Sequence, residues 1–373
     1  MKAAVSILAA TIVLSASSAR SLDSVQPFET MRALQDMQDG ISVGIDFLQV
    51  ASEERLTRFV SAVQSGAVDW TDRRNRSALL FYLVTGGDPH PVEPALEFVP
   101  KDTPDRKVIE RAFASAEAAQ GDADASLNSI DPRDTSPEVA GAIALAQGLS
   151  LARRDRLAAI VKLRDARLLA PGGLIEEMSL RQEMLLLRSA SEIGNLESLV
   201  ARYLAVFARS VHARRFLADF VEIGERAWKA KGNENRGAVL NALAAMPDDP
   251  RMQAGLRLVR SLLVLGDRKG ALTLIDASCG APQEAARCAF YKDLASVYDS
   301  VQTRKATPPT ARFETIDRLL RQCADALLNS ESGDSVGVAG NDIAAGSVDA
   351  ESGVIERSRA KIEEAERVLA RTR

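Results

Sequence analysis

The stretch Arg154–Arg188, RDRLAAIVKLRDARLLAPGGLIEEMSLRQEMLLLR, is the part of the chain that most clearly indicates its architecture. Pro171, Gly172 and Gly173 end one helical pattern and precede another, which predicts two helices joined by a tight turn. In the first helix, apolar residues at helical spacing predict one face covered by neighbours; in the second they lie on two faces, which predicts a helix between two others. These residues are Leu157, Ile160, Val161 and Leu168 in the first helix, then Leu174, Met178 and Leu185 on one face and Leu180, Met184 and Leu187 on the other face of the second.

Turn signals recur along the chain at the period of a two-helix repeat. Gly, or Arg in one case, is followed by Asp or Asn, which suits the end of one helix and the cap of the next. The turns lie at positions 87, 121, 154, 194, 232 and 266, which are 34, 33, 40, 38 and 34 residues apart. Small residues often follow five positions later, where the two helices of a hairpin would cross closely: Ser126, Ala159, Gly237 and Ala271. The pattern predicts an all-α fold, a TPR-like helical-hairpin solenoid, with a generic helical bundle as the alternative.

Two further apolar stripes predict packed inner helix faces in the second half of the chain. The first consists of Leu196, Leu199, Val200, Tyr203 and Phe207, and the second of Met252, Leu256, Val259 and Leu263. Both stripes follow helical spacing, so we expect them to be buried in either version of the fold.

Composition is that of an ordinary globular protein. The 373 residues are 46% hydrophobic and 26% charged, and the formal net charge is -4, which argues against nucleic acid as the main partner. Arginine clusters such as Arg73–Arg76 and Arg153–Arg156 have acidic residues close by and are interpreted as solvated surface.

The two ends of the chain differ in character from its centre. Residues 1–19 have a basic start, an apolar run and small residues before a cleavage point after Ala19, which predicts an export signal, with an uncleaved anchor as the alternative. We therefore predict a repeat domain over 20–329, with no membrane span in the mature chain. Residues 330–353 are small and polar without periodicity, which predicts a disordered, flexible linker, and 354–373 form a predicted C-terminal helix.

Three cysteines, Cys279, Cys288 and Cys323, lie in the last third of the chain. In an oxidising compartment one pair can close, and three pairings are open. Gly280 and Pro282 place a turn between Cys279 and Cys288, which favours that pair, while three buried free thiols are at least as plausible on the sequence alone.

Residue patterns for catalysis, cofactors or metals do not emerge from the sequence. It contains no GxSxG, GxxxxGK[ST] or GxGxxG arrangement of the required kind, and its two histidines, His90 and His212, are far apart. Glu-Ser pairs occur, as at Glu197–Ser198, but do not form a recognisable glycan-cleaving domain. We expect no catalytic, cofactor-binding or metal-ligating residue, and we interpret Trp70 and Trp228 as packing residues.

Two segments carry a family resemblance. The segment 74–89, RNRSALLFYLVTGGDP, and the segment 163–177, LRDARLLAPGGLIEE, together with Arg181 and 203–209, resemble the bacterial flagellar motor and chemotaxis family MotC over about residues 28–328. The resemblance implies a non-enzymatic periplasmic protein required for flagellar rotation that binds and supports the periplasmic part of the stator subunit MotB. These segments resemble packing and turn elements, so they indicate no binding surface. The alternative is a periplasmic TPR-like scaffold for another envelope assembly, such as secretion or polysaccharide export.

Overall fold

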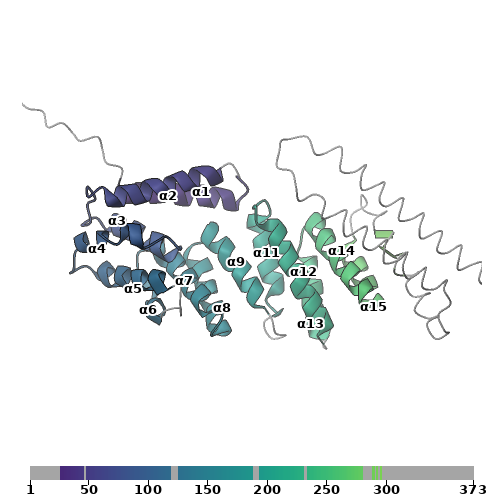
Figure 1. Cartoon of the computed structure of the whole chain (residues 1–373). Helices are drawn as coiled ribbons and strands as arrows, with labels where there is room; N and C mark the ends of the chain where they lie inside the picture. The colour runs from purple at the N-terminus through teal and green to yellow at the C-terminus, as the bar shows by residue number, and fades with distance from the viewer. Residues whose placement is uncertain are drawn as a thin grey trace, which may run out of the picture. The chain divides into compact units, whose positions relative to one another are not determined.

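The computed structural model describes residues 26–45, 48–118, 125–187, 193–230 and 233–279, with five further positions between 288 and 295. Every element in these ranges is a helix, which confirms the predicted all-α class (Figure 1). The export signal, the linker and the C-terminal helix predicted from the sequence lie outside the described residues. None of the described helices combines the length and the apolar character that crossing a membrane requires.

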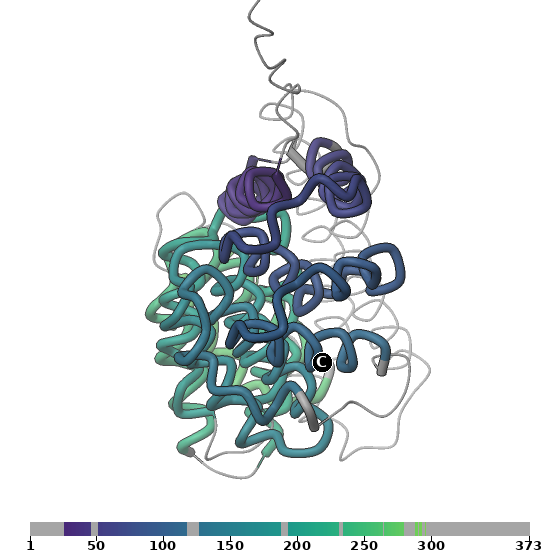
Figure 2. The backbone as a smooth tube through the Cα atoms, turned by 90° about the vertical axis from the view of Figure 1, so that its left-hand side faces the viewer, coloured from purple at the N-terminus to yellow at the C-terminus, as the bar shows by residue number. Residues whose placement is uncertain are grey.

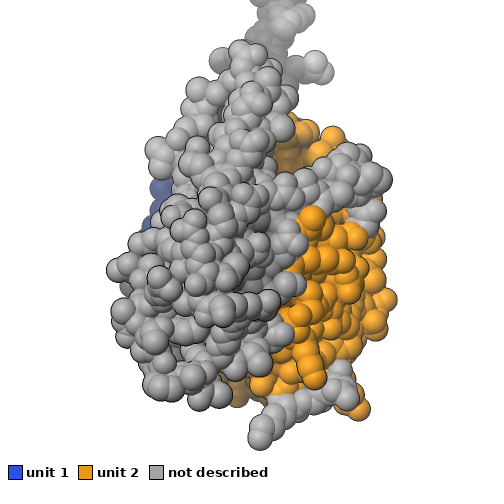
Figure 3. All heavy atoms as spheres, turned by 90° about the vertical axis from the view of Figure 1, so that its right-hand side faces the viewer, with its two compact units in different colours: residues 1–38, 47–146 blue, residues 39–46, 147–373 orange. Residues whose placement is uncertain are grey.

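The chain divides into two compact units, which Figure 3 colours blue and orange. Unit 1 comprises residues 1–38 and 47–146, and unit 2 comprises 39–46 and 147–373. Helices α1 and α7 each begin in unit 1 and have their last residues in unit 2. The helices that begin in unit 1 are α1 Pro27–Ser42, α2 Leu48–Gln64, α3 Arg73–Val84, η1 His90–Val92, α4 Ala95–Phe98, α5 Pro104–Ala118, α6 Ala125–Asn128, η2 Pro132–Asp134 and α7 Pro137–Leu151.

Helix α3 is the central element of unit 1. Asp72 caps its first turn by accepting a hydrogen bond from the Arg74 backbone N–H at 2.8 Å. The helix packs against α5, and Arg76 on α3 forms an ion pair with Asp105 on α5 at 2.9 Å. The ring of Tyr82 stacks on fully buried Phe59 of α2 with centroids 5.0 Å apart. These contacts join α2 and α5 to α3.

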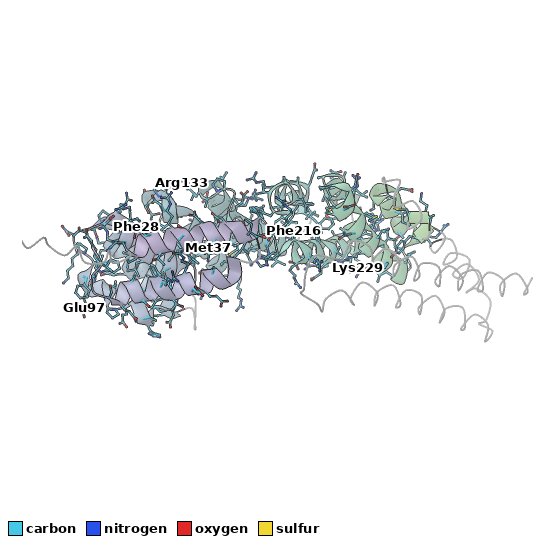
Figure 4. The ribbon with its side chains drawn as sticks, turned by 90° about the horizontal axis from the view of Figure 1, so that it is seen from above. Phe28, Met37, Glu97, Arg133, Phe216 and Lys229 are labelled. Atoms are coloured by element: carbon cyan, nitrogen blue, oxygen red, sulfur yellow. A yellow bond between two sulfur atoms is a disulfide. The ribbon has the colours of Figure 1, made fainter. Side chains whose placement is uncertain are left out.

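Unit 2 is a succession of helical hairpins (Figures 1 and 2). Helix α11 packs on α13, α12 on α14, and α13 on α15. Each of these three helices therefore contacts the second helix that follows it in the sequence. The rings of Tyr203 on α11 and Phe216 on α12 stack with centroids 3.7 Å apart at the centre of this core (Figure 4 labels Phe216). The helices are α8 Arg156–Leu169, α9 Leu174–Leu186, α11 Leu196–Phe207, α12 Ala213–Lys229, α13 Asn233–Ala244, α14 Asp248–Val264 and α15 Arg268–Ser278.

The two apolar stripes predicted in the second half of the chain are confirmed. The five residues of the α11 stripe are each at most 1% exposed, and the four of the α14 stripe at most 6%. The small residues Ala159 and Ala271, predicted at close helix crossings, are fully buried. Helical spacing therefore identified the covered faces of α11 and α14 correctly.

The predicted buried face of the first hairpin helix is wrong. In α8 only Ile160 of the four predicted residues is buried, while Leu157, Val161 and Leu168 are 65%, 57% and 78% exposed. Helix α8 instead buries a neighbouring face that carries two alanines, and on this face Leu163 and the Ala159 carbonyl lie close to Gly148 of α7. This buried face consists of Ala159, Ile160, Leu163 and Ala166.

Of the two apolar faces predicted for α9, one is buried and the other is only partly covered. Leu180, Met184 and Leu187 are buried as expected, whereas Leu185 is 37% exposed and Leu174 and Met178 are intermediate. Buried carboxylates occupy much of the covered surface of α9 in place of the expected apolar side chains.

Candidate functional site on the hairpin α8–α9

The turn between α8 and α9 is shaped by specific hydrogen bonds. Asp155 caps α8 by accepting from the Ala158 N–H at 2.9 Å, and Gly172 adopts a positive φ of 87° after Pro171. The side chain of Glu176 accepts from the Gly172 N–H at 2.6 Å, and that of Asp39 accepts from the Leu174 N–H at 2.8 Å. The first N–H of α9 and an N–H of the preceding turn thus find carboxylate partners, which suits the positive end of a helix.

Three glutamates on α9 point into the protein rather than into water. Glu176, Glu177 and Glu183 are 3%, 0% and 1% exposed. A buried carboxylate is costly unless charge and hydrogen bonds compensate it, so each must be held by partners. Those partners come from helices on both sides of α9 in the sequence.

Glu183 joins α9 to α8 through two arginines. The Nε atom of Arg164 donates to one carboxylate oxygen at 2.8 Å, and a terminal nitrogen of Arg167 donates to the other at 2.5 Å. The arginines are 43% and 24% exposed, so their outer edges reach solvent while Glu183 does not. This arrangement fixes the register of α8 against α9.

Glu176 joins α9 to α11 through a bidentate ion pair with Arg202. The Nε and a terminal nitrogen of Arg202 donate to its two oxygens at 2.6 and 2.8 Å. Burial alone would raise the pKa of this carboxyl, but the bonds from Arg202 and Gly172 outweigh it, and the pKa of Glu176 is lowered. The carboxylate therefore contributes to stability as an ion.

Glu177 lies at the centre of a fully enclosed polar cluster. The Tyr203 hydroxyl donates to it at 2.8 Å, and the Ser210 hydroxyl donates to the same oxygen. Burial and the adjacent carboxylate raise the pKa of Tyr203, so the phenol stays protonated and remains a donor. Burial and nearby Arg181 lower the pKa of His212, and burial raises that of Asp219.

The glutamates and metal-ligand types have the following surroundings in the structure. Glu177 is completely buried, and one of its oxygens accepts from Tyr203 and Ser210. Glu197 of the Glu197–Ser198 pair, by contrast, is an exposed surface residue in the first turn of α11. Within the described ranges, no group of three or more His, Cys, Asp or Glu side chains is arranged to hold a metal ion.

The outer face of α8 is the unusual surface of the hairpin. Leu157, Val161 and Leu168 are mostly exposed, and Arg164 lies between the last two on the same face. We call these four residues the outer stripe. Helical spacing alone placed the three apolar residues on one face, but nothing in the sequence marked that face as exposed.

The two tryptophans and the two histidines that the sequence analysis considered lie outside the hairpin α8–α9. Trp70 and Trp228 are buried, as predicted, and the indole N–H of Trp228 donates to Asp267 at 3.0 Å. His90 is exposed in η1, and His212 precedes α12 as its cap residue.

Cys279 and Cys288 are joined by a disulfide in the structure, with Cα atoms 6.0 Å apart. Cys279 ends α15, and Cys323 lies outside the described residues.

The buried glutamates were not predicted, although Glu176–Glu177 inside an apolar helical pattern was a visible irregularity. Their partner Arg202 lies 26 residues from Glu176, and Ser210 lies 33 residues from Glu177. Such pairings depend on how separate helices pack.

Comparison with known proteins identifies the family of the chain. The family model described as Chemotaxis protein MotC matches residues 1–371. The chain belongs to the MotC family. A relative named Chemotaxis protein MotC, from Rhizobium meliloti (strain 1021), is 25% identical over 345 residues, which cover 88% of this chain and 77% of that protein. No solved structure matches the chain. Membership in MotC makes this a motility- and chemotaxis-related protein and confirms the resemblance found in its sequence.

Proposed function

We propose that this chain is a non-enzymatic periplasmic protein required for flagellar rotation, which binds and supports the periplasmic part of the stator subunit MotB. The observation that carries the proposal is the match of the MotC family model to residues 1–371. A motility protein with an export signal at residues 1–19 would meet the stator on the periplasmic side of the membrane.

The helical architecture supports a binding role. We propose that the hairpins of unit 2 form a TPR-like repeat array, since α11, α12 and α13 each pack on the second helix after them. Arrays of this kind present extended surfaces to protein partners and need no cofactor. The buried Glu176 and Glu183 ion pairs would keep such a surface rigid.

Gene deletion and direct binding test the proposal together. A deletion strain is expected to build flagella that do not rotate, and the exported chain is expected to copurify with the periplasmic part of MotB. A strain that swims normally, together with a folded protein that does not bind MotB, would overturn the proposal.

The same experiment distinguishes the proposed motility function from the alternative, in which the chain is a scaffold for another envelope assembly. In that case motility would be intact while secretion or polysaccharide export would be impaired. A neighbouring set of flagellar genes would favour the motility function.

A further inference from the structure

The outer stripe of α8 has the spacing of a helix-packing seam. Its residues, 157, 161, 164 and 168, are separated by four, three and four positions, which is the alternation found where one helix packs along another. Its three apolar members are 57% to 78% exposed, so none of the helices that the structure describes covers them. Scattered exposed apolar residues are ordinary, but three in one seam indicate a contact surface.

Helix α15 provides an internal reference for α8. Both helices follow an aspartate cap, Asp155 or Asp267, whose carboxylate accepts from the N–H three residues later at 2.9 Å. Aligned on these caps, the two helices share three buried positions. The buried pairs are Ala159 with Ala271, Leu163 with Ile275, and Ala166 with Ser278.

The outer positions of the two helices differ in chemistry. Where α8 has Leu157, Val161 and Arg164, α15 has Lys269, Thr273 and Asp276, and all six are exposed. A hairpin helix with this cap and this buried face therefore forms without outer apolar residues. The leucines and valine of α8 are not explained by the fold of the hairpin itself.

The surroundings of the outer stripe are basic, although the whole chain carries a net charge of -4. Six basic residues lie between positions 153 and 167, against two acidic residues there and Glu183 beneath them. The basic residues are Arg153, Arg154, Arg156, Lys162, Arg164 and Arg167. An apolar seam in a basic setting complements an amphipathic helix that carries acidic residues beside its apolar face.

We propose that the outer stripe of α8 is the docking surface for an acidic amphipathic helix of the partner protein. This inference rests on the proposed function, because it takes that helix to belong to the periplasmic part of the stator subunit. Leucine and valine side chains supply the buried contact, and the surrounding arginines and lysine select an acidic partner.

Two other occupants fit the surface less well. The C-terminal segment 354–373 contains six basic and four acidic residues, so it shares the sign of the charge around the stripe. A second copy of the chain would bring the same basic stripe against itself. Like charges at a contact oppose both arrangements.

Photo-crosslinking in living cells tests the surface directly. The full chain carries benzoylphenylalanine at position 161 or 168, with position 273 on α15 as the matched control. We expect adducts from 161 and 168, and not from 273, with an acidic segment of the periplasmic part of MotB identified by peptide mass. Adducts with residues 354–373, with a second copy or with a basic segment, or no adduct at all, would overturn the inference.

Affinity measurement with purified protein supplies the second readout. The double variant Val161→Glu/Leu168→Glu is expected to bind the periplasmic part of MotB at least about tenfold more weakly, and Thr273→Glu within about twofold of the unchanged chain. Both variants should keep the helix content and melting temperature of the parent, because the altered positions are exposed.

The two proposals can fail separately. If MotB binds and the double variant binds as tightly as its parent, the docking surface is wrong and the proposed function stands. If positions 161 and 168 crosslink to an acidic helix of another envelope protein and MotB does not bind, the surface stands and the proposed function is wrong.

Discussion

Helices α11 and α8 carry apolar residues at the same helical spacing and use them in opposite ways. On α11, Tyr203 and Phe207 are fully buried among α12 and the helices that follow. On α8, Leu157 and Leu168 are 65% and 78% exposed, and the buried side rests on alanines and on ion pairs to Glu183. The difference shows that a periodic apolar pattern identifies residues that share a face, and not whether another element covers that face.

The largest expected effect is the loss of an aromatic ring from the covered stripe. Phe207→Ala should lower the free energy of unfolding by about 3–5 kcal/mol, because it removes buried apolar surface and leaves a cavity. Urea denaturation followed by circular dichroism measures this. A change below about 1 kcal/mol would mean that Phe207 is not packed in the protein core.

The core that covers α11 extends to the end of α15, where Cys279 packs against it. The disulfide to Cys288 closes a loop with a sequence separation of 9, for which chain entropy predicts roughly 2–3 kcal/mol of stabilisation. Cys288→Ala should lower the free energy of unfolding by that amount relative to the oxidised parent. Alkylation of the unreduced protein followed by mass measurement should label one of the three cysteines, and labelling of all three would contradict the bond.

Removing the charge beneath α8 should have an intermediate effect. Glu183→Gln leaves Arg164 and Arg167 without their carboxylate, and because both arginines reach solvent we expect a loss of about 1–2 kcal/mol. Glu197→Gln, at an exposed position on α11, is the matched control and should change the stability by less than about 0.5 kcal/mol. Equal effects in the two variants would show that the buried pairs do not anchor α8.

A smaller, pH-dependent effect on the free energy of unfolding should arise from the ion pair between Glu176 on α9 and Arg202 on α11. The folded-state pKa of Glu176 is lowered from its ordinary value of 4.5, so its stabilising contribution is complete above that pH and is lost as the pH falls through the folded pKa. Glu176→Gln should therefore be less stable than the parent at pH 7, and the difference should shrink below about pH 4.5. Urea unfolding across that range measures it, and a constant difference would contradict the role of the ionised carboxylate.

The smallest expected effect is on the outer stripe itself. Leu168→Ser removes an apolar side chain that is 78% exposed, so the free energy of unfolding should change by no more than about 0.5 kcal/mol. Thermal and urea unfolding beside Phe207→Ala measure the contrast between the two stripes. A loss comparable to that of Phe207→Ala would place Leu168 in the core.

The sequence by itself determined much of the local structure. The turns near 87, 154, 194 and 266 separate helices as predicted. Asp155 and Asp267 cap α8 and α15 with their side chains, whereas Asn195 precedes α11 without a side-chain cap bond, and of the turn glycines Gly266 has the expected positive φ. The sequence also predicted the all-α class and the buried faces of α11 and α14. These features depend on spacing within one helix or one turn, which a linear pattern records.

Only the tertiary structure decided which faces are covered and which charges meet. Leu157, Val161 and Leu168 are exposed because α8 packs through a different face, which carries its buried alanines. Which face packs depends on the shapes of the neighbouring helices. The burial of Glu177 beside Tyr203 and Ser210 likewise requires residues 26 and 33 positions away. Long-range packing has no short-range signature in the chain, so the candidate docking surface was visible in the sequence as an apolar stripe and recognisable as a surface only after folding.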